Sequence, residues 1–167
     1  MHELIKNRRS IRKFKADQPV TKDQLKTLLE AAMYAPSAQN KRPWEFIAIT
    51  DINLIRKIHA LLPNARMCDT ATAVISVIGI PRSDMPIGYI PGDCGAATQN
   101  ILLEAVNIGL GACWCGIYPR DERMLELRKL LNIPEPKIPF NVIAIGVPDE
   151  SPEPKGKFEE ERVTYIG

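Results

Sequence analysis

The chain has 167 residues, which is the length of one ordinary globular domain. Hydrophobic residues make up 45% and charged residues 25%, a composition that excludes a disordered chain, and the net charge of +2 argues against a nucleic-acid-binding protein. No apolar run approaches the roughly 20 residues that span a bilayer, and the N-terminal residues lack the apolar segment of a secretory signal. Four cysteines are too few for a disulfide scaffold, so a cytoplasmic protein is expected.

Apolar spacing and capping signals predict helices and strands throughout the first half of the chain. Thr21 and Gln24 have the spacing of a capping box, and Pro36 is expected to stop the helix that they begin. The run AVISVIGI is continuous, apolar and largely β-branched, as a central buried strand should be. In chain order, we expect a helix at 2–8, a helix at about 22–34, a strand at 45–50, a helix that Asp51 caps and that carries Leu54, Ile55, Ile58 and Leu62, and a strand at 73–80.

The second half of the chain combines the longest predicted helix with an extended tail. The helix expected at about 93–108 is apolar on much of its circumference, so it should be central or pack against a second copy of itself. Residues 148–167, the C-terminal arm, are rich in proline and charge. In chain order, we expect a loop at 81–92, the helix at about 93–108, a short strand or turn at 112–117, a helix near 120–131, a strand at 140–147 and a last strand at 162–166. Because helices and strands mix without a strict βαβ rhythm, the chain is predicted to be an α+β protein.

The segment RRSIRKF at residues 8–14 places four cations around the hydroxyl of Ser10. A run of basic residues is most often a solvated surface. Arginine side chains beside a serine hydroxyl are also what a phosphate group requires, because they donate charge-assisted and often bidentate hydrogen bonds. The segment alone leaves both interpretations open.

A second polar segment, PSAQNKRPW at residues 36–44, follows the helix predicted at 22–34. Ser37, Gln39 and Asn40 can donate hydrogen bonds to a heteroaromatic ring or a ribityl chain. Taken alone, the segment is more often an ordinary turn that ends a helix. Its position relative to the cationic segment is what makes it informative.

In this order, the two segments closely resemble the nitroreductase family of FMN-dependent oxidoreductases. That family opens with an R-R-S-x-R stretch and, after one helix, shows P-S-x-x-N-x-x-P-W running into a strand. GLGACWCGI at residues 109–117 resembles the family's G-x-G-x-x-W-x-G stretch, and KGK at residues 155–157 resembles a basic pair before its last strand. The matching residues of the first two segments are Arg8, Arg9, Ser10, Arg12, Pro36, Ser37, Asn40, Pro43 and Trp44.

The resemblance, which covers nearly the whole chain, implies a fold and a reaction. The implied fold is a three-layer α-β-α sandwich with a mostly antiparallel central sheet, formed by residues 1–167 as a single FMN-binding domain. The implied assembly is a homodimer with FMN at the interface, in which the C-terminal arm carries an exchanged strand. NAD(P)H would be the electron donor, and an electron-poor small molecule such as a nitroaromatic or a quinone would be the acceptor.

The resemblance also implies which residues bind FMN. A fixed cation near N1 and O2 of the flavin would stabilise the negative charge that arrives with the electrons. The expected contacts are Arg8, Ser10, Lys155 and Lys157 around the phosphate; Arg9 and Arg12 between the phosphate, the ribityl chain and the pyrimidine edge; Pro36, Ser37, Ala38 and Asn40 against the flavin of the other subunit; Asn64 and Arg66 near N1 and O2; and the backbone of Cys115 and Gly116 facing N5 and O4.

The chain departs from the family pattern at two positions. Ala38 stands where many members have a second Ser, and Arg42 stands where many have Gln before Pro-Trp. Neither change removes a required group, but both can alter substrate preference.

The sequence is also compatible with three other kinds of protein. The chain could be an FMN-binding, redox-sensing module without turnover, a specialised flavin enzyme such as a dehalogenase, or a nucleic-acid-binding module, which its modest net charge disfavours.

Cys113 and Cys115, with Cys68 and Cys94, could suggest zinc or an iron–sulfur cluster, but their spacing matches no common pairing, so buried thiols and no metal are expected. There is no G-x-G-x-x-G after a strand, so NAD(P)H is expected to bind over the flavin.

Overall fold

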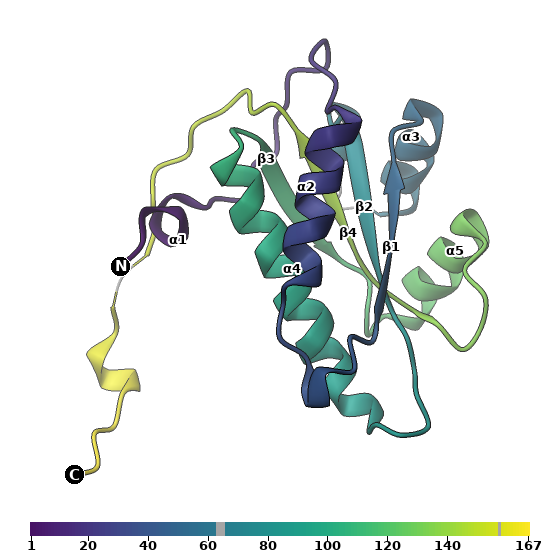
Figure 1. Ribbon diagram of the computed structural model, residues 1–167. Helices are drawn as coiled ribbons and strands as arrows, with labels where there is room; N and C mark the ends of the chain where they lie inside the picture. The colour runs from purple at the N-terminus through teal and green to yellow at the C-terminus, as the bar shows by residue number, and fades with distance from the viewer. Residues whose placement is uncertain (63–65, 157) are drawn as a thin grey trace.

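A four-stranded antiparallel sheet forms the centre of the computed structural model, which describes residues 1–62, 66–156 and 158–167 (Figure 1). The strand order is β1-β2-β4-β3, and every neighbouring pair is antiparallel. Since β2 lies in the middle of the sheet, it is buried along its whole length, as its continuous apolar run predicts. The strands are β1 (Trp44–Ile49), β2 (Ala73–Gly79), β3 (Gly111–Gly116) and β4 (Ile138–Gly146).

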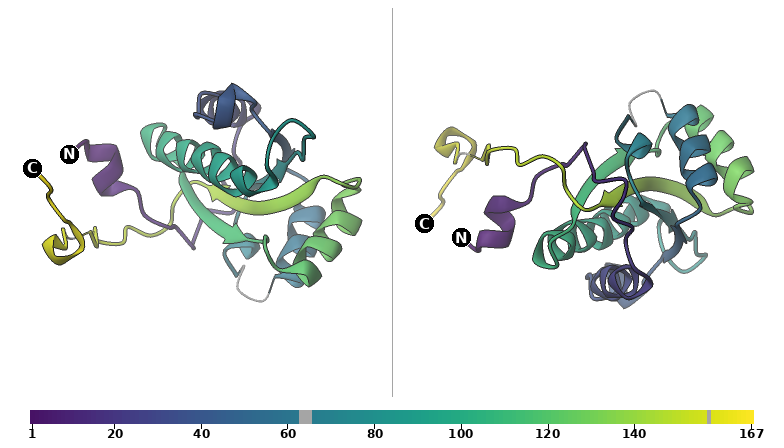
Figure 2. Two further views of the ribbon diagram at one scale, coloured as in Figure 1. Left: turned by 90° about the horizontal axis from the view of Figure 1, so that it is seen from below. Right: turned by 90° about the horizontal axis from the view of Figure 1, so that it is seen from above.

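Helices cover both faces of this sheet and produce three layers (Figures 1 and 2). The helices α2 and α4 pack together on one face, and α3 and α5 pack on the other. None of the described helices is long and apolar enough to cross a membrane. The helices are α1 (Glu3–Asn7), α2 (Lys22–Met33), α3 (Ile52–Leu61), α4 (Ile90–Asn107) and α5 (Asp121–Leu131).

Local signals in the sequence account for where these helices begin. The Thr21 hydroxyl accepts a hydrogen bond from the Gln24 backbone N–H at 3.2 Å, and the Gln24 side chain accepts one from the Thr21 N–H at 2.9 Å. This is the predicted capping box, and it satisfies two N–H groups at the start of α2. Asp51 likewise caps α3 by accepting a hydrogen bond from the Asn53 N–H at 2.8 Å.

Two hydrophobic cores lie on opposite faces of the sheet, and β4 contributes to both. Ile143 and Ile145 pack in the core under α2 and α4, whereas Val142 and Ala144 pack in the core under α3 and α5. Successive side chains of a strand point to opposite faces, so a strand covered on both sides must be apolar at nearly every position.

The N-terminal segment extends the sheet beside β3 and fixes the position of Arg12. The Ile11 N–H donates to the carbonyl of Ala112 at 3.1 Å, and Ser10 forms a parallel bridge with Ala112. This approach requires a glycine at position 111, because a Cβ there would lie 2.8 Å from the Cβ of Ile11.

The structure corrects two of the predicted boundaries and one predicted element. The longest helix begins at Ile90, earlier than the expected position 93, because Pro91 is accepted in the first turn of a helix. The fourth strand begins at Ile138, two residues before the expected position 140. The strand predicted at 162–166 is not formed within the described chain, where Glu160–Arg162 make a 3₁₀ turn. The physical reason is that the C-terminal arm runs past α1 and its end projects away from the sheet, where it has no strand to pair with (Figures 1 and 2).

Candidate functional site

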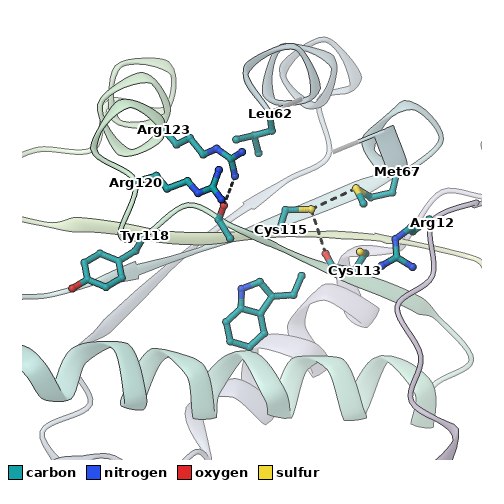
Figure 3. A pocket seen from close by; sticks show the side chains of 10 residues that line it. Arg12, Leu62, Met67, Cys113, Cys115, Tyr118, Arg120 and Arg123 are labelled. Atoms are coloured by element: carbon teal, nitrogen blue, oxygen red, sulfur yellow. Dashed lines mark hydrogen bonds between the residues drawn. The ribbon is translucent and has the colours of Figure 1, made fainter. Parts of the chain in front are cut away.

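A pocket of about 440 Å³ lies along β3, at the edge of the sheet nearest α5 (Figure 3). Its lining combines three arginines with sulfur-containing and aromatic side chains, and it includes no carboxylate. The lining residues are Arg12, Leu62, Met67, Cys113, Trp114, Cys115, Gly116, Tyr118, Arg120 and Arg123.

The edge strand β3 forms the floor of the pocket. Strand alternation places Cys113 and Cys115 on one face and Trp114 on the other, where its ring packs against Phe140 with a centroid distance of 5.8 Å. The sulfur of Cys115 lies 3.5 Å from the sulfur of Met67. Beyond the bridge at Ala112, the outer edge of β3 pairs with no other strand among the described residues. Its outward backbone groups can therefore hydrogen-bond to the edge of a planar ligand.

Positive charge is placed at both ends of this pocket (Figure 3). Arg12 lies at the end nearest the N-terminal segment, where its guanidinium donates to the carbonyl of Ser10 at 3.4 Å. Arg120 and Arg123 lie at the other end, where Arg123 donates to the carbonyl of Gly116 at 3.2 Å. Such a pocket favours a ligand that carries or develops negative charge.

The pKa values of the two thiols of the floor are shifted in opposite directions. A hydrogen bond from Cys115 lowers the pKa of Cys113 from 9.0 to about 7, and the charge of Arg12 and a hydrogen bond from Ser10 also lower it, although burial and the negative charge of Glu150 oppose the change. The same hydrogen bond, together with burial and the negative charge of Cys113, raises the pKa of Cys115. Burial raises the pKa of Cys68 to about 12. The 113–115 pair is therefore expected to lose its first proton more readily than Cys68 does.

The 36–42 loop is the most strained segment of the described backbone. Gln39, Asn40 and Arg42 have φ values of 52°, 54° and 49°, a left-handed conformation that residues other than glycine rarely adopt. The hydroxyl of Ser37 holds the loop by accepting a hydrogen bond from the Arg42 N–H at 2.9 Å. The buried carboxylate of Asp93, at the start of α4, accepts one from the Ala38 N–H at 3.0 Å. Backbone strain of this kind is concentrated at functional sites.

The structure brings together only some of the residues predicted to form the site. Arg12, Cys115 and Gly116 line the pocket, and Ser10 lies beside it through its bridge to Ala112. The 36–42 loop lies against the start of α4, on the other face of the sheet (Figure 1).

The other predicted residues lie outside the pocket lining. Arg9 borders a separate cavity next to Pro148 and Glu150. Arg8 ends α1, Arg66 is exposed in the 3₁₀ turn beside Met67, and Lys155 is exposed on the C-terminal arm. Asn64 and Lys157 lie outside the described residues.

Sequence reasoning missed Arg120, Arg123 and Asp93. Both arginines lie within seven residues after the ACWCG strand, so their position close to that motif in the sequence could have indicated them. Asp93 could not be recognised, because its partner Ala38 lies 55 residues away in the sequence.

Comparison with known proteins identifies the family. Residues 5–65 and 80–147 match the family model described as "Nitroreductase family". The chain belongs to the nitroreductase family. Nitroreductases are oxidoreductases, so the predictions of the family and of an enzyme are confirmed.

Individual nitroreductase relatives extend this result. The "Putative NADH dehydrogenase/NAD(P)H nitroreductase" of Methanothermobacter thermautotrophicus is 41% identical over 165 residues, which cover 96% of this chain and 84% of the relative. The crystal structure of a protein with the same name from Parabacteroides distasonis is 39% identical, with a TM-score of 0.91 over 99% of this chain and 96% of that one. The structure of an FMN-dependent nitroreductase from Clostridium difficile is 27% identical, with a TM-score of 0.90 over 100% and 99% of the two chains. These matches confirm the predicted α+β nitroreductase fold.

Proposed function

We propose that the chain is an FMN-dependent NAD(P)H oxidoreductase that reduces nitroaromatics, quinones or similar electron-poor molecules. The observation that carries this proposal is the pocket along β3, where a fixed cation, an open strand edge and a volume of about 440 Å³ occur together. Relatives named NAD(P)H nitroreductase and FMN-dependent nitroreductase support the same donor and cofactor. A nitroreductase structure from Desulfovibrio desulfuricans, 26% identical to this chain, is a complex with FMN.

The residues present fit FMN. The outward backbone groups of Cys115 and Gly116 can bond to the polar edge of the ring, and the Arg12 guanidinium can stabilise negative charge at the pyrimidine side. The Nε atom of Arg9 is buried and has no hydrogen-bond partner among the described residues, which is consistent with a phosphate ligand near the 8–12 segment. When bound, the flavin supplies the hydride chemistry between donor and acceptor. The chain itself would bind and orient the reactants, and the buried side chains of Leu62 and Met67 would form an apolar part of the pocket wall.

The proposed enzyme is a homodimer, with residues 1–167 as one domain and the C-terminal arm crossing to the second subunit. Phe158, Tyr165 and Ile166 on the arm are 72%, 77% and 95% exposed, which is a large apolar exposure for a segment that makes no core. The strained 36–42 loop lies on the face opposite its own pocket, so it is available to the flavin of the other subunit. The four free thiols are consistent with a reducing cytoplasm.

The experiment is to record the visible spectrum of the purified protein and to identify the released cofactor by chromatography. A flavin spectrum with FMN as the released species, bleached anaerobically by NADH or NADPH and restored by a nitroaromatic or a quinone, is the expected result. A protein that is reduced but fails to pass electrons to any acceptor would be a redox-sensing module and not the proposed enzyme. A protein that binds riboflavin or FAD in place of FMN would contradict the assignment of the phosphate site.

A further inference from the structure

Arg120 and Arg123 present two guanidinium groups at the end of the pocket opposite Arg12 (Figure 3). The chain turns after β3, and the Arg120 N–H donates to the carbonyl of Ile117 at 3.0 Å. The carbonyl of Arg120 then accepts a hydrogen bond from the Met124 N–H at 2.9 Å, within the first turn of α5. These backbone bonds fix the turn from which both arginines reach the pocket.

These two arginines differ from the basic residues of this fold that are paired with a carboxylate. Lys41, Arg82 and Lys137 each form an ion pair with a carboxylate. Within the described part of the chain, no ion pair neutralises Arg120 or Arg123, and the pocket lining contains no carboxylate. Asp121 and Glu122 in the first turn of α5 reduce the positive electrostatic potential around the two arginines, but both are exposed and neither lines the pocket.

The two arginines have different surroundings. Arg123 is half-buried and bonded to the carbonyl of Gly116, so its charge is held at the end of β3. Arg120 is exposed, and its guanidinium donors make no hydrogen bond to another described residue. Arg120 therefore has its donors free for a ligand, while Arg123 contributes charge and supports the pocket wall.

We propose that Arg120 and Arg123 form a subsite for an anionic group, a carboxylate or a phosphate, carried by a substrate that is turned over in the adjacent pocket. This inference rests on the proposed function. The phosphate of FMN itself is proposed to lie near Ser10 and the N-terminal segment, beyond the opposite end of the pocket. The subsite therefore selects among donors or acceptors by charge, with Arg120 as the specificity-determining contact.

The test compares two acceptors that differ in one charge, 4-nitrobenzoate and its neutral methyl ester, in the FMN-loaded full chain. Arg120→Gln should lower kcat/KM for 4-nitrobenzoate about tenfold, since a charge-assisted hydrogen bond contributes about that much. The same variant should change kcat/KM for the ester less than about twofold and leave the FMN content unchanged. Arg56→Gln, on the exposed side of α3, removes the same charge away from the pocket and is the matched control.

A second arm assigns the anion to the donor or to the acceptor. Anaerobic flavin reduction is followed with NADH, NADPH and the uncharged reduced nicotinamide riboside, and reoxidation is followed with the acceptor pair. A selective loss in Arg120→Gln for the charged member of either series supports the subsite and identifies its source. Equal losses for charged and neutral members, or no loss in either series, would overturn it. If the wild-type protein reduces the neutral ester, but Arg120→Gln affects charged and neutral substrates alike, the subsite is ruled out while the proposed function stands.

Discussion

The Asp93 carboxylate accepts a hydrogen bond from the Ala38 N–H across 3.0 Å and joins the first turn of α4 to the 36–42 loop. The Asp93 side chain is only 8% exposed, and its second oxygen, Oδ2, has no hydrogen-bond partner among the described residues. The loop that it holds contains three residues with left-handed φ. We infer that Asp93 keeps the loop in a conformation that the loop would not hold by itself.

Replacing Asp93 tests this role. Asp93→Ala should lower the free energy of unfolding by about 1.5–3 kcal/mol, since it removes a buried hydrogen bond to a charged group. Asp93→Asn should cost less, because the amide oxygen can still accept the hydrogen bond from Ala38. Urea denaturation measures the difference between the variants. If both variants lose the same stability, the hydrogen bond is not what holds the loop.

The close approach of the N-terminal segment to β3 gives a second prediction. A Cβ at position 111 would lie 2.8 Å from both the Cβ and the Cγ2 of Ile11, so Gly111→Ala must displace the segment that carries Arg12. The expected cost is about 1–3 kcal/mol, with weaker FMN binding as a consequence. Gly88→Ala is the matched control, because nothing lies within 4 Å of a Cβ there. Thermal unfolding measures the loss of stability. If Gly111→Ala and Gly88→Ala lower the melting temperature equally, the packing argument is contradicted.

The thiols should differ in reactivity according to their pKa values. The pKa of Cys113 is lowered to about 7, whereas burial raises the pKa of Cys94 to about 12. Because the thiolate is the nucleophile, alkylation of the 113–115 pair by iodoacetamide should speed up as the pH rises through about 7 and level off above it. Bound FMN should protect the pair.

Mass spectrometry of the alkylated apoprotein checks this order. Modification of Cys68 or Cys94 before the 113–115 pair would show that the charge distribution in the pocket is not as described. Replacing any one of the four cysteines with Ser should leave turnover largely intact, since no thiol is assigned to the reaction.

The C-terminal arm should support both the dimer and the cofactor. Deleting residues 155–167 removes the exposed apolar side chains of the arm together with Lys155. The truncated chain should unfold at a lower temperature and release FMN, and both effects should increase on dilution because they depend on subunit association. Size-exclusion chromatography with light scattering reports the assembly. A truncated chain that remains yellow and active as a monomer would contradict the exchanged-arm dimer.

Features set by neighbours along the chain could be predicted from the sequence. The capping box at Thr21 and Gln24 depends on residues three positions apart, and β2 is recognisable because a strand covered on both faces must be apolar throughout. The cationic segment and the 36–44 segment could be assigned to a flavin protein only through their resemblance to a family.

Features that depend on the path of the chain in space could not be predicted. Arg120 and Arg123 reach the pocket only because the chain turns back after β3, and Asp93 meets Ala38 only after α4 has packed beside the loop. The strand predicted at 162–166 is not formed within the described chain, because the end of the C-terminal arm lies away from the sheet and has no strand there to pair with.

The most direct test of the proposed function is a two-substrate kinetic measurement with NADH or NADPH and a nitroaromatic or quinone acceptor. Donor and acceptor are proposed to use the same pocket in turn, because one open pocket lies along β3 beside the cations. Plots of reciprocal rate against reciprocal donor concentration should therefore be parallel at different acceptor concentrations. Intersecting lines would contradict a shared pocket, and NAD(P)H oxidation that stops after one equivalent per FMN would contradict an enzyme that turns over.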